Sequence, residues 1–584
     1  MTDTINGSDA ILKVIRSWGV DHIYGYPGGS YDSGMNAIYN QKKELKFIRV
    51  RHEEAGALAA SAEAKLTGKI GVCFGSSGPG AAHLLNGLYD ARSDHAPVLA
   101  MVAQVPSTNM NLDFFQAVDE EPMFEDVANA YCKTAITAES LPRLIDDAIR
   151  HAYKYHGVAA VIIPKDFGWA KIKDNYITNA NNLQKPIYPE PDPDKIDKAY
   201  NLIKNAKAPE LYFGLGAKNS RKELEEISKK FKMPLVSSVP AKGVVPNGFK
   251  GYLGSEGRVG SKPASETSFN ADVALEVGED VPFSIFYFPP KTKVIQIDTD
   301  IEKLGKRHPT TVGILADAKK SLQALLNKGK ELKPTAFYKA SLADMDNWEK
   351  WHNSFIDSKE TPVRPEPIYD VLDKTASDKA IFTVDVGNSN INFERLINMH
   401  DDQKWTLSGQ HATMGYAVPA GQAAKIVYPD RDVYTLSGEG AFPMMGQEIL
   451  TQIEYNLHVI NIVFSNGTLG YIEGEQRDDT HQPLSGVYLP DTNWEAITNG
   501  FGAKGYTARN KQEFKNALED AKSVKGPVVI DVKLTHEMPL TTQHMYIDPA
   551  FQDQKKIDEF VKKYKAQSLK PFSYFLKKAK NEQL

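Results

Sequence analysis

Short runs of Val, Ile and other apolar residues alternate along this chain with amphipathic stretches long enough to form helices. A run that is apolar at every position is typical of a strand with both sheet faces covered, as in a parallel sheet. Such runs occupy residues 71–74, 98–102, 158–163, 294–297, 381–384, 459–464 and 528–531. The pattern therefore predicts an α/β fold in which parallel sheets are flanked by helices.

Two proline-rich stretches divide the chain. Residues 186–193 (PIYPEPDP) contain four prolines and residues 362–367 (PVRPEP) contain three. Because proline fixes φ and has no N–H donor, neither stretch is expected to run through a helix or a central strand. A chain of 584 residues is long enough for three or four domains of about 100–200 residues each. We therefore expect three domains, at residues 1–185, 186–361 and 362–584.

The first and third of these segments resemble each other. Residues 69–80 (KIGVCFGSSGPG) and 432–442 (DVYTLSGEGAF) each join a strand to a glycine turn, and a helical stretch and a second strand follow. Each segment then reaches a Gly-aliphatic strand, at Gly157 and Gly526. The similarity predicts two related domains on either side of a different middle one. The alternative, that any two strand–turn–helix units share this much, stays open.

Composition argues against several classes of protein. The 69 Lys and Arg residues nearly balance the 74 Asp and Glu residues, so no basic excess indicates nucleic-acid binding. The two cysteines, Cys73 and Cys132, are too few for a disulfide framework or a cysteine-based metal cluster. No apolar run approaches the ~18 residues of a membrane span, and the first ten residues lack a signal-peptide pattern. We therefore expect a cytoplasmic protein with neither a nucleic-acid nor a membrane partner.

Oxygen-bearing side chains follow two strands of the third segment. Gly438, Glu439 and Gly440 come after one strand, and Asn466 and Thr468 come after another. The carboxyl ends of neighbouring parallel strands meet at one edge of a sheet, where open α/β sheets bind ligands. Carboxylate, amide and carbonyl oxygens suit Mg2+ or Ca2+ together with substrate phosphates, and glycines let a diphosphate approach closely. The alternative is a glycine turn with a solvated glutamate.

Glu53 stands at a strand-to-helix junction in the first segment, within Arg51-His52-Glu53-Glu54. A carboxylate at the start of an apolar helix can lose its solvation and act as an acid or a base. The alternative is a glutamate that only stabilises the helix dipole. His83, near a helical stretch, is expected to be a packing or polar residue rather than a metal ligand.

Further motifs occur in order over all three segments. They are GYPGGS at 25–30, VRHEE at 50–54, GSSGPG at 75–80, Phe115-Gln116, PAKG at 240–243, YLG at 252–254, LGKRH at 304–308, ATMG at 412–415 and GYIEGEQ at 470–476. Together they resemble the motifs of thiamine-diphosphate-dependent flavoenzymes, most closely those of pyruvate oxidases of lactic acid bacteria. The resemblance implies that the first and third domains are related thiamine-diphosphate-binding folds, with a pyrimidine-binding first domain and a diphosphate- and metal-binding third domain. The middle domain would bind FAD.

The resemblance also implies a reaction and its participants. Pyruvate would be oxidatively decarboxylated with phosphate and O2 to acetyl phosphate, CO2 and H2O2, through a hydroxyethyl-thiamine diphosphate enamine and FAD. The cofactors would be thiamine diphosphate, FAD and Mg2+, with Ca2+ as an alternative ion. The site would lie between two subunits of a homotetramer built from dimers.

Individual residues receive roles by the same resemblance. Glu53 would hydrogen-bond the aminopyrimidine ring of thiamine diphosphate, and Met414 would bend that cofactor. The residues around the reacting pyruvate would be Gly29, Ser30, Phe115, Gln116, Val386, Tyr471 and Glu475. Further cofactor contacts would be Gly387, Asn388, Gly438, Gly440 and Ala441 for thiamine diphosphate, and Gly214, Gly216, Ala217, Arg258, Asp298, Asp317 and Ile472 for FAD. The metal ligands would be Glu439, Asn466 and Thr468.

One metal ligand departs from the family pattern, which has Asp where this chain has Glu439. Glutamate is one methylene longer, so its oxygen must be retracted or the ion must move. Mg2+ demands near-ideal geometry, whereas Ca2+ tolerates variation. Metal identity and cofactor affinity are therefore the properties that this residue is expected to change.

Three rival functions stay open. One is an acetolactate synthase-like carboligase that uses FAD without redox chemistry. Another is a quinone-reducing pyruvate oxidase, whose tail helix would place Ile557, Phe560, Val561 and Tyr564 on a membrane surface. The third is a non-catalytic assembly protein that retains the fold.

Overall fold

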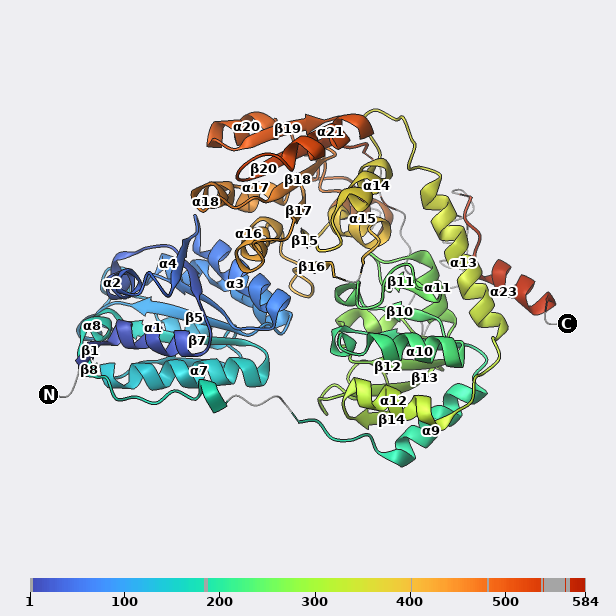
Figure 1. Ribbon diagram of the computed structural model, residues 1–584, viewed down its shortest axis with the longest axis horizontal. Coiled ribbons are helices and arrows are strands. Elements are labelled where there is room, and N and C mark those ends of the chain that lie inside the picture. The colour runs from blue at the N-terminus through green and yellow to red at the C-terminus, as the bar shows by residue number, and fades with distance from the viewer. Residues whose placement is uncertain are drawn as a thin grey trace.

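The computed structural model describes residues 4–182, 187–400, 402–479, 483–536, 539, 562 and 568–582. Within these residues the chain forms three six-stranded sheets, each with all neighbouring strands parallel and with helices against it (Figure 1). A short antiparallel pair, β1 (Thr4–Asn6) with β8 (Lys171–Lys173), adds to the first sheet's domain. The α/β fold predicted from the apolar runs is confirmed, and each of the seven runs lies in a strand or overlaps one.

The first sheet has the strand order β3-β2-β4-β5-β7-β6. Its strands are β2 (His22–Gly25), β3 (Lys46–Arg49), β4 (Gly71–Gly75), β5 (Val98–Gln104), β6 (Tyr131–Thr134) and β7 (Val158–Pro164). Its helices are α1 (Gly7–Ser17), α2 (Asp32–Asn40), α3 (Glu53–Thr67), α4 (Pro79–His83), α5 (Leu85–Ser93), α6 (Glu120–Glu125), α7 (Leu141–Tyr155) and α8 (Lys165–Trp169). Strands β4, β5 and β7 are buried along their whole length, as their apolar sequences predict.

The third sheet repeats this topology, with the order β16-β15-β17-β18-β20-β19. Its strands are β15 (Ile381–Val384), β16 (Lys404–Leu407), β17 (Val433–Gly438), β18 (Ile460–Ser465), β19 (Lys504–Ala508) and β20 (Val528–Lys533). Its helices are α14 (Pro365–Thr375), α15 (Asn388–Leu396), α16 (Ala417–Val427), α17 (Phe442–Met445), α18 (Ile449–Glu454), α19 (Gly470–Gly474), α20 (Trp494–Phe501) and α21 (Lys511–Ala521). Numbered along the chain, both sheets read 2-1-3-4-6-5, so the predicted kinship of the two domains is confirmed.

The middle sheet is different, with the order β11-β10-β9-β12-β13-β14. Its strands are β9 (Pro209–Phe213), β10 (Leu235–Ser237), β11 (Tyr252–Ser255), β12 (Val273–Val277), β13 (Lys293–Asp298) and β14 (Thr310–Leu315). Its helices are α9 (Pro193–Asn205), α10 (Arg221–Phe231), α11 (Lys262–Asn270), α12 (Ala318–Lys328) and α13 (Ala336–Asn353), and α23 (Phe572–Asn581) packs on α13. In chain order it reads 3-2-1-4-5-6, the arrangement of dinucleotide-binding sheets.

The proline-rich stretches lie between these units. Helix α9 begins at Pro193 and α14 begins at Pro365, because the first turn of a helix does not use the N–H that proline lacks. Residues 187–192 belong to no helix or strand, and Pro186 lies outside the described residues. The domain limits at 185/186 and 361/362 remain predictions.

The first and third domains share a hydrophobic core. Helix α3 is rich in alanine, and its buried residues pack on β4 and on Tyr416, Ala420 and Ala423 at the start of α16. Small side chains let the helices and the sheet approach closely. This contact fixes the start of α3 relative to the third domain (Figure 1).

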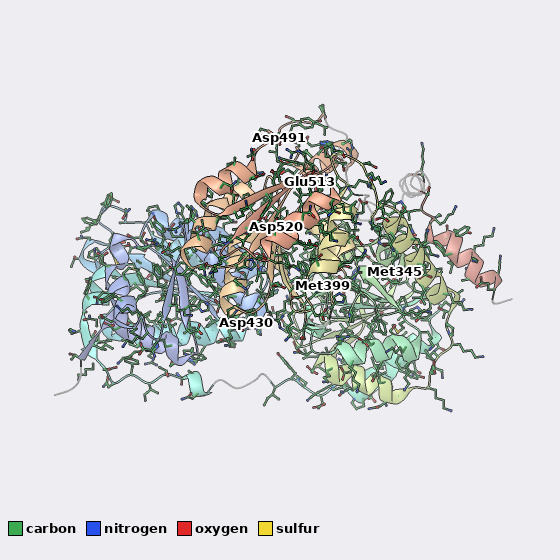
Figure 2. The ribbon with its side chains drawn as sticks, turned by 45° about the horizontal axis from the view of Figure 1, so that its top comes forward. Met345, Met399, Asp430, Asp491, Glu513 and Asp520 are labelled. Carbon is green, nitrogen blue, oxygen red and sulfur yellow. The ribbon has the colours of Figure 1, made fainter. Side chains whose placement is uncertain are left out.

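The middle and third domains meet through polar groups as well as packing. Lys242 Nζ donates to the Glu394 carbonyl at 2.9 Å, and Trp405 Nε1 donates to the Lys242 carbonyl at 2.8 Å. Met399, which is labelled in Figure 2, is buried at this junction, and its backbone N–H donates to Asn247 Oδ1 at 3.1 Å. No helix within the described residues is long and apolar enough to cross a membrane. The tail residues Ile557, Phe560, Val561 and Tyr564 lie outside the described residues.

We predict that Gly71→Ala destabilises the protein. A Cβ atom on Gly71, in β4, would collide with the backbone carbonyl of Ala60 in α3, and overpacking of this kind costs about 1–3 kcal/mol. The measurement is the unfolding midpoint in urea or on heating. Gly248→Ala is the matched control, because no atom lies within 4 Å of the added methyl group; equal midpoints for the two variants would contradict the prediction.

Candidate active site

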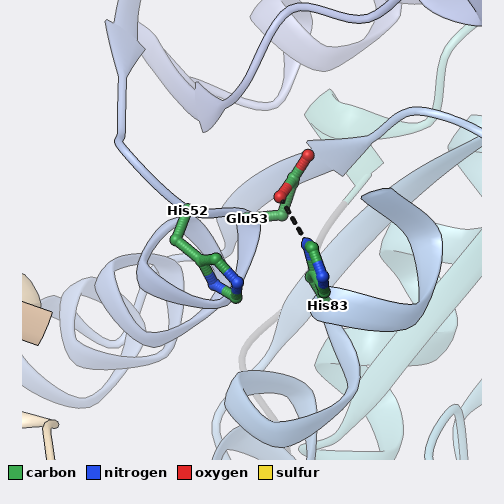
Figure 3. A group of neighbouring side chains, drawn as sticks. All are labelled: His52, Glu53 and His83. Carbon is green, nitrogen blue, oxygen red and sulfur yellow. Dashed lines mark hydrogen bonds and ion pairs between the residues drawn. The ribbon is translucent and has the colours of Figure 1, made fainter. Parts of the chain in front are cut away.

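Glu53 begins α3 and is held by a histidine. Its side chain is nearly buried, with the residue 8% exposed, and Oε2 accepts a hydrogen bond from Nδ1 of His83 at 2.9 Å. The His83 ring stacks on His52, the residue that caps α3, with 4.3 Å between ring centroids (Figure 3). The hydrogen bond restrains the carboxylate, and the stacking on His52 restrains the donor ring. His83 was expected to be a packing or polar residue, and its link to Glu53 could not be read from the sequence.

These three residues also present ligand atoms within 4.8 Å of one another, a spacing that a metal ion could bridge. The stacking of His52 on His83 argues against that use, because lone pairs of stacked rings run side by side instead of converging. The hydrogen bond between His83 and Glu53 is the interaction that the structure shows directly. We therefore assign His83 to the orientation of Glu53.

The glycine turn after β4 brings further predicted residues to Glu53. A Cβ atom on Gly80 would lie 3.1 Å from Glu53 Oε1, so glycine leaves room beside the carboxylate. The Ser30 hydroxyl accepts a hydrogen bond from the N–H of Ser77 at 2.7 Å, and a Cβ atom on Gly29 would meet no atom within 4 Å. These residues follow β2 and β4, where the strand order of the first sheet reverses and where open α/β sheets bind ligands.

Phe115 and Gln116 lie on a loop beside the same turn. A Cβ atom on Gly78 would lie 3.0 Å from the carbonyl oxygen of Gln116. Phe115 is 78% exposed, and the neighbouring exposed apolar residues are Leu112, Phe114 and Val118. Exposed apolar residues gathered on one loop are typical of interaction surfaces.

Glu439 and Asn466 lie on neighbouring loops of the third sheet. The Glu439 carboxylate accepts a hydrogen bond from the N–H of Gly467, and the Glu439 N–H donates to the Phe464 carbonyl at 3.1 Å. Burial raises the pKa of Glu439, and the hydrogen bond from Gly467 opposes that shift. Thr468 donates its hydroxyl to Glu473 at 2.8 Å. The three predicted metal ligands are therefore within two loops, although the Thr468 hydroxyl is already engaged.

Two glycine-containing loops flank the point where the third sheet reverses its strand order, between β15 and β17. One holds Val386, Gly387 and Asn388, and the other holds Gly438, Gly440 and Ala441. Gly387 has a φ of +116°, and a Cβ atom on Gly387 or Gly438 would meet no atom within 4 Å. The loops thus leave open space for a diphosphate next to the oxygen atoms of Glu439 and Asn466.

Met414 lies in a pocket between the first and third domains. The pocket has a volume of about 390 Å³, and its lining residues are His52, Glu54, Asn86, Thr413, Met414, Met444, Met445 and Gln447. Asn86 Nδ2 donates to Glu54 Oε1 at 2.6 Å and to Thr413 Oγ1 at 2.9 Å. Asn86 therefore links Glu54, the neighbour of Glu53, to Thr413, the neighbour of Met414, within one chain.

Arg258, Tyr471 and Glu475 meet where the middle domain contacts the third. Arg258 Nη1 and Glu475 Oε1 form an ion pair at 2.6 Å, and the guanidinium lies 4.3 Å from the centroid of the Tyr471 ring. Ile472, next to Tyr471, is partly exposed. Arg258, predicted to contact FAD, is thus in direct contact with two residues of the 470–476 motif.

The predicted FAD residues separate into two groups. Gly214, Gly216 and Ala217 follow β9, and a Cβ atom on Gly216 would lie 2.7 Å from Cα of Gly278, which follows β12. This backbone approach lies where the middle sheet reverses its strand order, so the glycines form a cradle that suits a dinucleotide. Gly278 was not predicted, although its place after an apolar run was a usable signal.

Asp298 and Asp317 have local roles in the described residues. Asp298 Oδ1 accepts a hydrogen bond from the N–H of Asp300 at 2.9 Å, and burial raises the pKa of Asp298. Asp317 caps α12 by accepting from the N–H of Lys320 at 3.0 Å. Among the described residues no hydrogen bond joins Glu53 to Glu439 or Asn466.

Comparisons with known proteins agree with this geometry. The family models for the N-terminal TPP binding domain, the central domain and the C-terminal TPP binding domain of thiamine pyrophosphate enzymes match residues 5–123, 196–325 and 385–532. Pyruvate oxidase of Lactiplantibacillus plantarum is 42% identical over 97% of this chain and 95% of its own length. A putative thiamine pyrophosphate-containing protein, YdaP of Bacillus subtilis, is 37% identical over 92% and 93%, and acetolactate synthase of Arthrospira platensis is 30% identical over 91% and 95%. The chain therefore belongs to the thiamine pyrophosphate (thiamine diphosphate) enzyme family and is a thiamine-diphosphate-dependent enzyme.

Proposed function

We propose that this protein is a pyruvate oxidase, which converts pyruvate, phosphate and O2 to acetyl phosphate, CO2 and H2O2. The observation that carries the proposal is the 42% identity to a pyruvate oxidase over 97% of the chain. The contact of Arg258 and Glu475 supports it, because it joins the middle domain to residues expected at the reacting centre. The middle domain is the one that binds FAD in this family, and the cradle at Gly214, Gly216 and Gly278 fits such a group.

Glu53 and His83 form the end of the site that would bind the pyrimidine ring. Thiamine diphosphate, when bound, supplies the carbon nucleophile that attacks the keto group of a 2-oxo acid. Glu53 hydrogen-bonds its aminopyrimidine ring, and the low dielectric of a buried position strengthens that bond. His83 is a positioning residue, since it holds the carboxylate in one orientation.

Glu439, Asn466 and Thr468 would hold Mg2+ or Ca2+ together with the diphosphate of the cofactor. A carboxylate and an amide oxygen are the donors that these ions prefer. FAD, when bound, accepts two electrons. The Arg258 guanidinium balances the charge of Glu475 next to the reacting centre, so the anionic substrate meets no unpaired carboxylate there.

A second copy of the chain completes the site. The exposed loop with Phe115 and Gln116 would enter that copy, and burial of its apolar residues would stabilise the contact. We propose a homotetramer built from dimers, located in the cytoplasm and without nucleic-acid or membrane partners.

The proposal predicts O2 uptake by the purified protein that requires pyruvate, phosphate, thiamine diphosphate and Mg2+, with acetyl phosphate and H2O2 as products. Glu53→Gln removes the proton donor and acceptor, so we expect turnover to fall by about 10²–10⁴-fold. Glu139→Gln, at an exposed position of the same domain, is the control and should keep wild-type turnover.

Other outcomes of this assay identify the rivals. Acetolactate formed from pyruvate without O2 uptake would replace the proposal with a carboligase. Reduction of a quinone, stimulated by lipid, would replace O2 as the acceptor. Equal turnover of Glu53→Gln and wild type would contradict the role of Glu53.

We also predict that Glu439 sets the metal preference. Shortening it in Glu439→Asp removes its reach to the Gly467 N–H and frees the carboxylate for the stricter geometry of Mg2+. The ratio of thiamine diphosphate affinities measured with Mg2+ and with Ca2+ should shift toward Mg2+ by about tenfold, or about 1.4 kcal/mol. Glu439→Gln keeps the length and loses the charge, so it should weaken binding with both ions; an unchanged ratio in Glu439→Asp would refute the prediction.

A further inference from the structure

Two glutamates lie next to the glycine cradle of the middle domain and have no place in the reaction proposed above. Glu276 is in β12, and Glu279 follows Gly278 directly. The Cα atom of Glu279 lies 2.7 Å from the position that a Cβ atom on Gly214 would occupy. Glu279 is therefore part of the wall of the proposed FAD cradle.

Both carboxyl groups are buried away from solvent. Glu276 is 1% exposed and Glu279 is 3% exposed. Glu279 Oε1 accepts from the N–H of Val281 in its own loop. Oε1 of Glu276 and Oε2 of Glu279 are buried without a hydrogen bond from the described residues, and the buried hydroxyl of Ser284 lies near Glu279 as a neighbouring donor.

The two carboxyl groups are within hydrogen-bonding reach of each other. Two ionised carboxylates would repel strongly at this separation in a medium of low dielectric. A single proton between them removes the repulsion and supplies the missing donor, as in other close carboxyl pairs. Burial raises the pKa of Glu279 to about 7, and burial together with the charge of Glu279 raises the pKa of Glu276 further.

The cation near the pair does not take the place of this proton. The titratable groups that face the pair are Tyr212 from β9, Asp280 and Tyr287 from the segment after β12, Asp298 from β13 and Arg307 from the loop before β14. The cation among them, Arg307, is bonded to Asp280 at 3.0 Å. The remaining groups are neutral tyrosines or acids, and acids favour retention of the proton.

We propose that Glu276 and Glu279 form a proton-sharing pair beside the dinucleotide cradle, and that binding of FAD there is coupled to retention of one proton by the pair. The proposal rests on the proposed FAD site. The diphosphate of FAD brings negative charge toward Glu279, and a nearby negative charge favours the protonated form of an acid. Affinity is therefore highest where the pair already holds its proton, and it falls when the pH rises above that range.

The experiment measures FAD binding to the apoprotein between pH 6 and pH 9. Flavin fluorescence gives the dissociation constant, and calorimetry in two buffers of different ionisation enthalpy gives the number of protons taken up. For wild type we expect a constant affinity below pH 7, a weakening that approaches about tenfold per pH unit above it, and uptake of up to one proton.

The variants assign this effect to the pair. Glu279→Gln cannot hold the shared proton as an acid, so its FAD affinity should be independent of pH and exceed that of wild type at pH 9. Glu276→Gln should lose the pH dependence as well. It tests the same pair if Glu279→Gln does not fold. Glu302→Gln, at an exposed position after β13, is the control and should follow the wild-type curve.

The outcomes are distinct. A flat wild-type affinity without proton uptake would overturn the proton-sharing pair and leave the FAD site standing. A wild-type slope that persists in both Gln variants would also overturn it. Failure of the folded wild-type protein to bind FAD at any pH would overturn the FAD site together with this proposal.

Discussion

The packing of α3 between β4 and α16 is the contact on which the candidate site depends. Alanine side chains keep the helix close to both partners, and glycine at position 71 keeps β4 within reach of it. The N-terminus of α3 therefore has one position, and Glu53 and His52 stand on it. A looser core would leave the Glu53 carboxylate without a defined direction, and its bond to His83 would not fix it.

The same physical arrangement recurs at the edge of all three sheets. Each reverses its strand order between two strands that end in glycine-bearing loops, and each reversal opens a crevice. In the first domain the crevice holds Glu53, in the third it holds Glu439, and in the middle domain it holds Gly278 and Glu279. The chemistry thus differs between the crevices because of the few polar residues placed on similar loops.

Much of this fold follows from the sequence, and the parts that do not are instructive. The run at 381–384 is β15 itself, because a strand covered on both faces is apolar at every position. Strand β3 is harder to predict from the sequence, because its end residues are charged and exposed. Asp317 was assigned to FAD by resemblance, which stays a prediction, and the capping of α12 by its side chain is a further role that the structure shows. The pairing of Glu53 with His83 joins residues thirty positions apart, and no local pattern encodes such a contact.

The acidic residue at the reacting centre and the acidic pair beside the FAD cradle are stabilised in different ways. Glu475 is matched by Arg258 across a domain boundary, at the place where an anionic substrate is expected. Among the described residues no cation is bonded to Glu276 or Glu279, because the nearby Arg307 is bonded to Asp280, so burial favours a shared proton instead. Two acidic positions of one chain are thus stabilised differently, one by a cation from another domain and the other by a proton held in a buried place.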